Sequence, residues 1–165
     1  MSLILPLDCE LEQVEDVVIH LEQEELFPDV FETYERAYTG DLQAWEEDRE
    51  PLTWRADYVV SIPLTSDLTC TLLGEIREPA EGVLVARSVL QPAAISEDDD
   101  GVFDQDWRME AWVDQGHRVL HIEALWRHMD AGVVNTENEA IRGLVLDGIE
   151  DWDEQVQRWC DLGVP

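Results

Sequence analysis

Residues 52–62 read Leu-Thr-Trp-Arg-Ala-Asp-Tyr-Val-Val-Ser-Ile, and this stretch decides the fold class. Apolar side chains stand at every second position from Leu52 to Ile62, and mostly polar side chains fill the positions between them. This period of two is typical of a β-strand that buries one face and exposes the other. The stretch therefore predicts a sheet in the middle of the chain.

Further strand-like runs follow toward the C-terminus. They lie at residues 68–76, 83–90, 107–113 and 117–125, and the last two flank a turn at residues 114–116 that predicts a hairpin. Strands that succeed one another with short connections pair as antiparallel neighbours. We therefore predict an antiparallel meander of about five strands.

Helical spacing of apolar residues occurs on both sides of the strand region. It predicts a helix over residues 9–26, a second short helix after Asp29 that includes Tyr34 and Ala37, and a further turn or two within residues 41–50. After the strands, Thr136 and Glu139 have the spacing of a capping box. They begin an amphipathic helix over residues 136–160.

Helices, then strands, then a helix indicate an α+β fold in which the helices pack on one face of the sheet. We interpret residues 1–165 as a single domain, with residues 1–50 mainly helical, residues 52–125 mainly strands and residues 136–160 the C-terminal helix. The 45% of hydrophobic residues and the seven Trp are enough for a hydrophobic core.

The charge of the chain is strongly unbalanced. Asp and Glu number 39 against ten basic residues, all of them Arg, which gives a formal net charge of -29. The first fifty residues hold 16 acids and 2 Arg, a net charge of -14. A field of this sign repels phosphate, so we expect no direct binding to nucleic acid or to an anionic membrane.

The three cysteines predict a reducing environment. Cys9, Cys70 and Cys160 are odd in number and widely spaced, and none belongs to a Cys-x-x-Cys pair. We therefore expect reduced thiols and a cytoplasmic protein. The chain also shows neither a secretory signal nor an apolar run of the roughly 18 residues that a membrane helix requires.

Two groups of residues in the sequence have partial metal-ligand patterns. His117, His121 and Glu123 share a face of the predicted strand and could ligate zinc or iron. The apolar alternate residues, such as Ile122, predict that the opposite face points to the core and that the histidine face is solvated. The acidic loop at residues 96–101 lacks two ligands of a calcium loop. We therefore expect no metal ligand, no cofactor and no catalytic residue.

Acidic residues on the predicted helices are the candidate binding surface. Carboxylates three or four residues apart on a helix lie about 5 to 6 Å apart along its axis, and duplex DNA carries one charge per roughly 1.7 Å. Two or three such rows could therefore imitate DNA. The candidate partner-binding residues are Glu15, Asp16, Glu22, Glu25, Glu32, Glu35, Glu46, Glu47, Asp48, Asp147, Glu150, Asp151, Asp153 and Glu154.

These charges favour a non-enzymatic protein that binds and inhibits a basic, nucleic-acid-binding protein. Such a DNA mimic would serve a phage or plasmid against restriction or CRISPR enzymes, and a homodimer is compatible with it. Two alternatives stay open. The chain could be an immunity protein that neutralises a basic nuclease toxin, or a housekeeping or enzymatic domain of a halophile whose acidity is an adaptation to salt.

Overall fold

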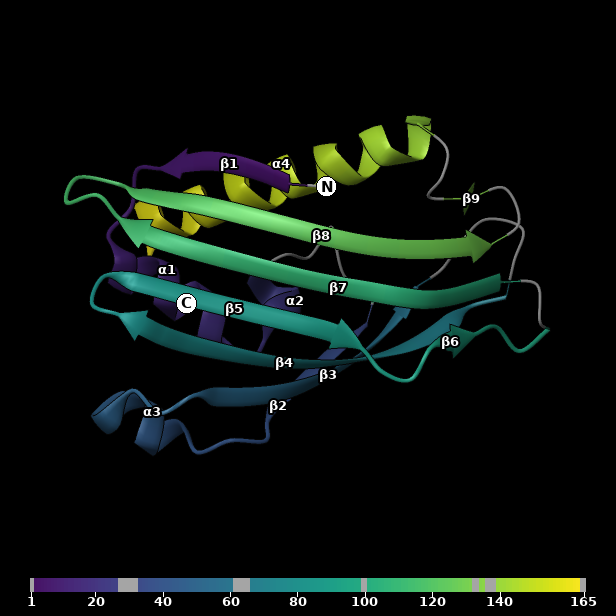
Figure 1. Cartoon of the computed structure of the whole chain (residues 1–165), viewed down its shortest axis with the longest axis horizontal. Coiled ribbons are helices and arrows are strands. Elements are labelled where there is room, and N and C mark those ends of the chain that lie inside the picture. Colours follow the sequence, from purple (N-terminus) through teal and green to yellow (C-terminus); the bar gives the residue numbers. More distant parts are fainter. Residues whose placement is uncertain are drawn as a thin grey trace.

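One large antiparallel sheet dominates the structure (Figure 1). The computed structural model describes residues 2–26, 33–60, 66–98, 101–131, 134–135 and 139–163. The strands follow the order β1-β8-β7-β5-β4-β3-β2, while β6 pairs with β7 and β9 pairs with β8. The elements are β1 (Ser2–Leu7), α1 (Leu11–Ile19), α2 (Gln23–Leu26), β2 (Tyr34–Tyr38), α3 (Leu42–Asp48), β3 (Leu52–Val60), β4 (Leu68–Ala80), β5 (Val83–Leu90), β6 (Ala94–Ile95), β7 (Gly101–Asp114), β8 (Val119–Ala131), β9 (Val134–Asn135) and α4 (Glu139–Leu162).

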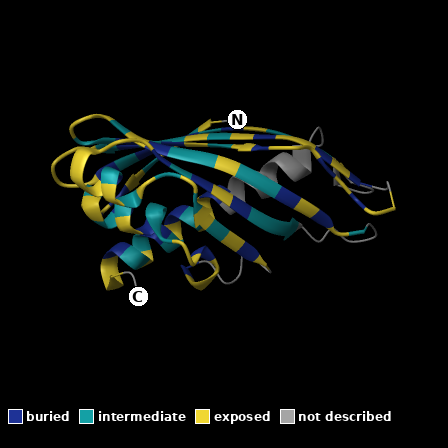
Figure 2. Ribbon diagram, turned by 90° about the horizontal axis from the view of Figure 1, so that it is seen from below, coloured by how far each residue is buried: buried dark blue, intermediate teal, exposed yellow. Residues whose placement is uncertain are grey.

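The helices lie on one side of the sheet, so the α+β fold class is confirmed. Figure 2 shows the sheet arching over them, with buried and exposed residues alternating along the strands. We call the sheet face toward α1, α2 and α4 the inner face, and the opposite face the outer face. The predicted hairpin is also confirmed, because β7 pairs with β8 from Gly101↔Ala131 to Asp114↔Val119.

The prediction was wrong at the N-terminal end of the chain. Residues 2–7 form an edge strand that pairs with β8. The sequence predicted no strand there, only a mainly helical region whose first helix begins at residue 9. The predicted helix over residues 9–26 is interrupted after Ile19 and resumes as α2. Tyr34–Tyr38 is an edge strand paired with β3, not a helix, because Tyr34, Arg36 and Tyr38 alternate toward the inner face. The meander is thus larger than five strands.

The two main parts of the described hydrophobic core lie along the inner face, and a third cluster joins residues 34, 54 and 56 of β2 and β3. The larger part joins α1 and the end of α4 to the sheet, through residues that include Val14, Trp45, Leu84, Trp112 and Val156. The smaller part lies at the other end of the sheet, around residues 68, 70, 90, 94 and 103. Between the two parts the inner face of β7 and β8 carries charged residues, which are described below.

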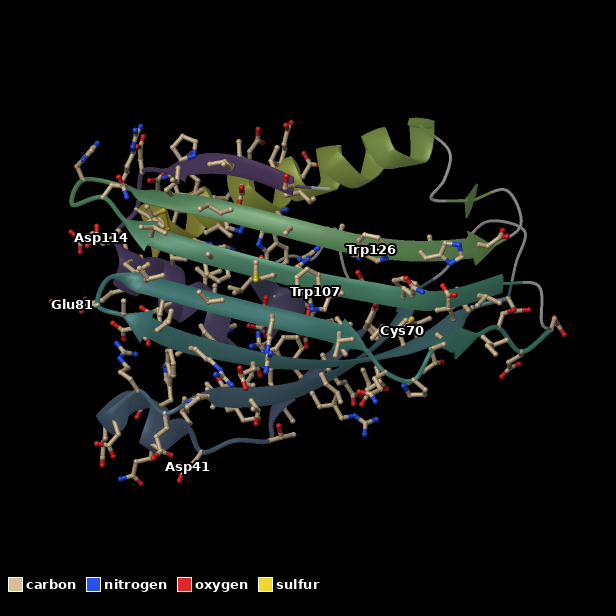
Figure 3. The ribbon with its side chains drawn as sticks, viewed as in Figure 1. Asp41, Cys70, Glu81, Trp107, Asp114 and Trp126 are labelled. Atoms are coloured by element: carbon tan, nitrogen blue, oxygen red, sulfur yellow. A yellow bond between two sulfur atoms is a disulfide. The ribbon has the colours of Figure 1, made fainter. Side chains whose placement is uncertain are left out.

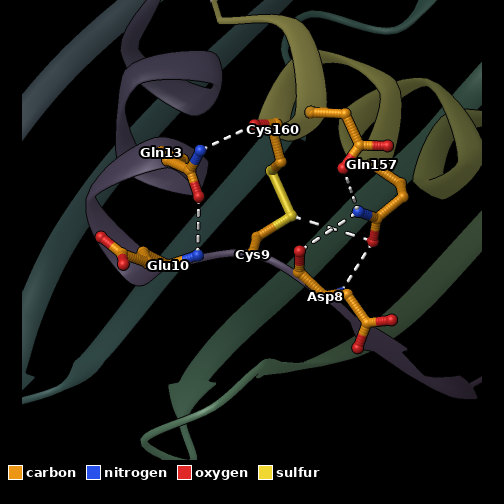
Figure 4. Close-up of a disulfide and its surroundings, with 7 residues drawn as sticks. Asp8, Cys9, Glu10, Gln13, Gln157 and Cys160 are labelled. Atoms are coloured by element: carbon orange, nitrogen blue, oxygen red, sulfur yellow. Dashed lines mark hydrogen bonds between the residues drawn. A yellow bond between two sulfur atoms is a disulfide. The ribbon is translucent and has the colours of Figure 1, made fainter.

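A disulfide joins the start of α1 to the end of α4 (Figure 4). Cys9 and Cys160 form this bond over a sequence separation of 151 residues, so the expectation of three reduced thiols was wrong. Gln13 Nε2 donates to the carbonyl of Cys160 at 2.7 Å, and the amide N–H of Asp8 donates to Gln157 Oε1 at 2.7 Å. Only proximity in the fold, which spacing does not reveal, brings the two cysteines together.

Among the described residues, each helix is either too short or too polar to cross a lipid bilayer.

Candidate functional site

The structure exposes most of the predicted acidic residues. Those that are exposed are Asp16, Glu22, Glu25, Glu35, Glu46, Glu47, Asp48, Glu150, Asp151 and Glu154. Glu15 is half-buried and Asp153 is buried, so neither belongs to an open surface. Glu32 and the side chain of Asp147 lie outside the described residues.

Helix α1 connects the acidic helices to one another. The disulfide and the Gln13 hydrogen bond hold it against α4. On its other side, Glu15 accepts a hydrogen bond from Trp45 Nε1 of α3 at 2.9 Å and pairs with Arg49. The exposed acids of α1, α3 and α4 therefore belong to three helices in direct contact, at one end of the sheet.

An open groove of about 500 Å³ lies where α1 ends. Its lining combines apolar and acidic side chains and consists of Asp16, Ile19, His20, Leu21, Glu22, Tyr38 and Leu42. Strand β2 positions it, because the Tyr38 hydroxyl donates to the carbonyl of Ile19 and Arg36 Nη1 donates to the carbonyl of Val18 at 2.8 Å. The C-terminal end of a helix carries partial negative charge, which adds to that of the carboxylates.

The electrostatics of this groove favour a cation. Partial burial and the neighbouring carboxylates of Glu15 and Glu12 raise the pKa of Asp16. A carboxyl whose pKa is raised by like charges gains stability when a positive group arrives. The groove is therefore a surface on which a basic side chain would be stabilised both by its charge and by its apolar stem.

Most of the described arginines form ion pairs within the chain. Six described arginines pair with carboxylates of the same chain, and these are Arg49, Arg55, Arg77, Arg87, Arg108 and Arg127. Arg36 lies over the ring of Trp54 at 4.4 Å and donates to a carbonyl. Among the described residues, Arg118 and Arg158 are left outside these contacts to offset the exposed acids.

The histidine face of β8 points inward, contrary to the sequence prediction. His121 and Glu123 are each only 2% exposed and face the helices. Ile122, expected in the core, lies on the outer face between them. His117 is exposed in the hairpin loop and does not join His121. The outer face of β8 is as apolar as a core face, so the sequence prediction assigned the two faces of the strand the wrong way round.

A polar cluster therefore crosses the inner face of β7 and β8. Glu110 is the cross-strand partner of Glu123. A carboxylate oxygen of Glu110, a ring nitrogen of His121 and a carboxylate oxygen of Glu123 all lie within 4.8 Å of one another. Arg108 Nε lies 3.1 Å from Glu123 Oε1. From α4, the Asp153 carboxylate approaches His121 Nδ1 at 2.8 and 3.0 Å.

Burial and charge compete in this cluster. Burial would lower the pKa of His121, but the Asp153 and Glu110 carboxylates outweigh it and raise that pKa to about 9. Burial raises the pKa of Glu123 to about 7, against the opposing effect of Arg108. Burial also acts to raise the pKa of Glu110, but His121 and Arg108 outweigh it and lower that pKa. Perturbed carboxyl and imidazole groups of this kind are typical of functional sites.

An apolar row runs across the outer face of the sheet. Leu73, Val89, Trp107 and Trp126 are direct cross-strand partners on β4, β5, β7 and β8. Trp107 is 41% exposed and Trp126 is 66% exposed, and Figure 3 shows both on the outer side of the sheet. Trp45 and Trp112, which lie off the clearest apolar stripes in the sequence, are buried instead.

Sequence reasoning missed Glu110, Arg108 and the role of Asp153. A signal was present, because charged residues occupy alternate positions in both arms of the hairpin, at 106, 108 and 110 and at 121 and 123. Alternate positions share one face of a strand. The signal went unused because charged faces are normally solvated.

Comparison with protein families and with curated proteins finds no match. Among solved structures, the chain is similar to the crystal structure of TTHA0849 from Thermus thermophilus. The similarity covers 100% of this chain and 99% of that chain, with 14% sequence identity and a TM-score of 0.55. At this identity the likeness concerns the fold alone.

Proposed function

We propose that this protein is a non-enzymatic binding protein that holds a basic, nucleic-acid-binding protein by its acidic helices. The observation that carries the proposal is the groove at the end of α1, which Asp16 and Glu22 line, together with the exposed carboxylates of α1, α3 and α4. The partner's nucleic-acid site would be occupied, and so inhibited, as a DNA mimic would do.

The groove suggests how the partner is anchored. The stem of an arginine would lie along Leu21 and Leu42, and its guanidinium would meet the carboxylates of Asp16 and Glu22. Further exposed acids on α3 and α4 would act over longer distances, by raising the rate of association with a basic surface. Binding should therefore weaken steeply as salt is added.

The experiment is capture of partners from a cell extract of the source on the immobilised full chain. Bound proteins are released with a 30-base-pair DNA duplex and, separately, with rising potassium chloride. The double variant Asp16→Asn/Glu22→Gln is compared with Glu97→Gln/Asp130→Asn, which removes the same charge from exposed positions outside the groove. We expect DNA to release a nucleic-acid-binding protein, and the groove variant to retain less than about a tenth of it.

Two results would contradict the proposal. Capture that survives molar salt and is unaffected by DNA would show that the bound protein does not use a nucleic-acid site. Equal losses in the groove variant and in the control variant would show that only net charge matters. An immunity protein differs in having one dedicated nuclease partner, which the same capture identifies.

The apolar row favours a second contact, with another copy of this chain. The charges around it are nearly balanced, since the outer face of β3 to β5 carries Arg55, Arg77 and Arg87 against Asp57 and Glu75. Two copies joined by their outer faces would keep their acidic helices apart. The tryptophans would supply the buried area of the contact.

Sedimentation at several protein concentrations tests this dimer. The variant Trp107→Ser/Trp126→Ser should shift it to monomer, whereas Leu162→Ser, which removes an exposed apolar residue of α4, should not. A wild type that is monomeric at every concentration would refute the dimer and leave the partner proposal untouched.

A cytoplasmic location is part of the proposal, although a disulfide between Cys9 and Cys160 is more typical of oxidising compartments. Thiol alkylation in intact cells of the source distinguishes the two.

A further inference from the structure

The polar cluster on the inner face contains a histidine nitrogen that is directed at two carboxylates. His121 Nε2 is buried and forms no hydrogen bond with the described residues, and its nearest carboxylate oxygen, Glu110 Oε1, is 3.7 Å away. Glu123 Oε1 is also buried and accepts no hydrogen bond there, although Arg108 lies beside it. Buried polar atoms normally find partners, so two such atoms in one cluster call for a ligand.

The rest of the histidine is held firmly. Nδ1–H of His121 donates a hydrogen bond to the Asp153 carboxylate, which leaves the lone pair of the neutral ring on Nε2. The ring of Trp112 stacks on the imidazole, with centroids 5.1 Å apart and an interplanar angle of 6°. A carboxylate on one ring nitrogen and an open second nitrogen is the arrangement that orients histidines in metal sites.

The carboxylates are placed by the strand register. Glu110 of β7 and Glu123 of β8 are direct cross-strand partners, and His121 lies two residues from Glu123 on the same face. Their ligand atoms lie within 4.8 Å of one another, close enough for all three to contact one ion. An imidazole and two carboxylates form a donor set that suits divalent transition metals, and three protein ligands leave one position open.

The charges agree with a divalent cation. A metal ion on Nε2 takes the place of the proton that His121 carries in the metal-free protein. With the imidazole neutral in this way, Glu110, Glu123 and Asp153 carry three negative charges, and Arg108 offsets one of them. Arg36 lies farther away on β2 and still acts on Glu110, so the cluster remains negative even when it is counted. Glu123 Oε1 lies beside Arg108 Nε, so the charge of this carboxylate would be shared between the arginine and the ion.

We propose that Glu110, His121 and Glu123 bind one divalent transition-metal ion, with Asp153 positioning the histidine. The site is independent of the groove and of any partner. The ligand set differs from the one considered in the sequence, because Glu110 takes the position of His117. The pairing of β7 with β8 brings Glu110 next to Glu123.

The experiment uses the full chain, stripped with EDTA and titrated with Zn²⁺ by calorimetry and with Co²⁺ by visible absorption. We expect one equivalent of either ion per chain. Glu110→Gln/Glu123→Gln should abolish this binding, Asp153→Asn should weaken it about 10- to 100-fold, and His117→Gln should leave it unchanged. Circular dichroism checks that each variant is folded.

A long-range ¹H–¹⁵N spectrum of the wild type with Zn²⁺ makes the test independent of variants. Of the signals of the four histidines, we expect that of His121 Nε2 to change its chemical shift when Zn²⁺ is added. No stoichiometric binding would overturn the proposal. So would binding that survives in Glu110→Gln/Glu123→Gln and disappears in His20→Gln, because the group of His20, Glu22 and Glu25 also has ligand spacing.

Discussion

A methyl group added at Gly74 should destabilise the protein through Trp54. The Cβ of an alanine would lie 2.0 Å from Trp54 Cε2 and Cζ2, where ordinary contact begins at 3.4 Å. The indole would therefore have to move by more than 1 Å. Trp54 is buried beneath the guanidinium of Arg36, which is 4.4 Å from its ring, so the movement would also disturb that contact.

We expect Gly74→Ala to lower the free energy of unfolding by about 3 kcal/mol, from overpacking of roughly 1–3 kcal/mol and a cation–π contact of about 1–2 kcal/mol. In a Trp54→Leu background the clash is gone. There the same substitution should raise stability by roughly 0.5–1 kcal/mol, because alanine loses less backbone entropy than glycine on folding.

Urea unfolding followed by circular dichroism measures all four proteins without relying on tryptophan fluorescence. The reversal of sign between the two backgrounds is the diagnostic result. If Gly74→Ala costs the same free energy with and without Trp54, the close approach of the indole to this glycine is not the cause, and the reasoning is refuted.

Three further outcomes follow from the disulfide, the polar cluster and the net charge. Reduction of Cys9–Cys160, which closes a loop over 151 residues, should lower the free energy of unfolding by about 5 kcal/mol; urea curves with and without reductant test this, and three free thiols in the untreated native protein would contradict it. In EDTA, His121, whose pKa is raised to about 9, should contribute about 3 kcal/mol below pH 6.5 that is lost as the pH rises to 9. Glu123, raised to about 7, acts in the same direction between pH 4.5 and 7, and a wild-type stability that rises from pH 6.5 to 9, or an Asp153→Asn variant with an unchanged slope, would exclude this origin. Thermal melts from about 20 mM to 2 M potassium chloride should show a folded protein throughout, with a melting temperature that rises with salt; unfolding at low salt would support adaptation to a salty cytoplasm instead.

The sequence predicts the strands better than it predicts which way they face. The period of two in residues 52–60 and in the hairpin is strong, because each strand alternates between two environments. On β8, however, Ile122 on the outer face is as apolar as a core residue, and His121 and Glu123 on the inner face are charged. Polarity alone therefore assigned the two sides the wrong way round.

The candidate sites illustrate the same limit. The exposure of acids such as Asp16 and Glu22 was predicted correctly, since charged residues at helical spacing are usually solvated. Asp153 was not, because its burial depends on His121, 32 residues away in the sequence. Contacts at such separations are set by the packing of α4 on the sheet, which periodicity cannot supply.

The link between Cys9 and Cys160 also determines how the protein responds to mechanical force. Tension applied outside this pair passes through the two sulfur atoms and bypasses the 151-residue separation between them. About 500 Å of chain, at roughly 3.5 Å per residue, would thus stay out of reach until the bond is reduced. An unfoldase that pulls the chain through a narrow pore would reach a closed loop at this disulfide. The pore would then have to admit two segments of the chain side by side, unless the bond is reduced first.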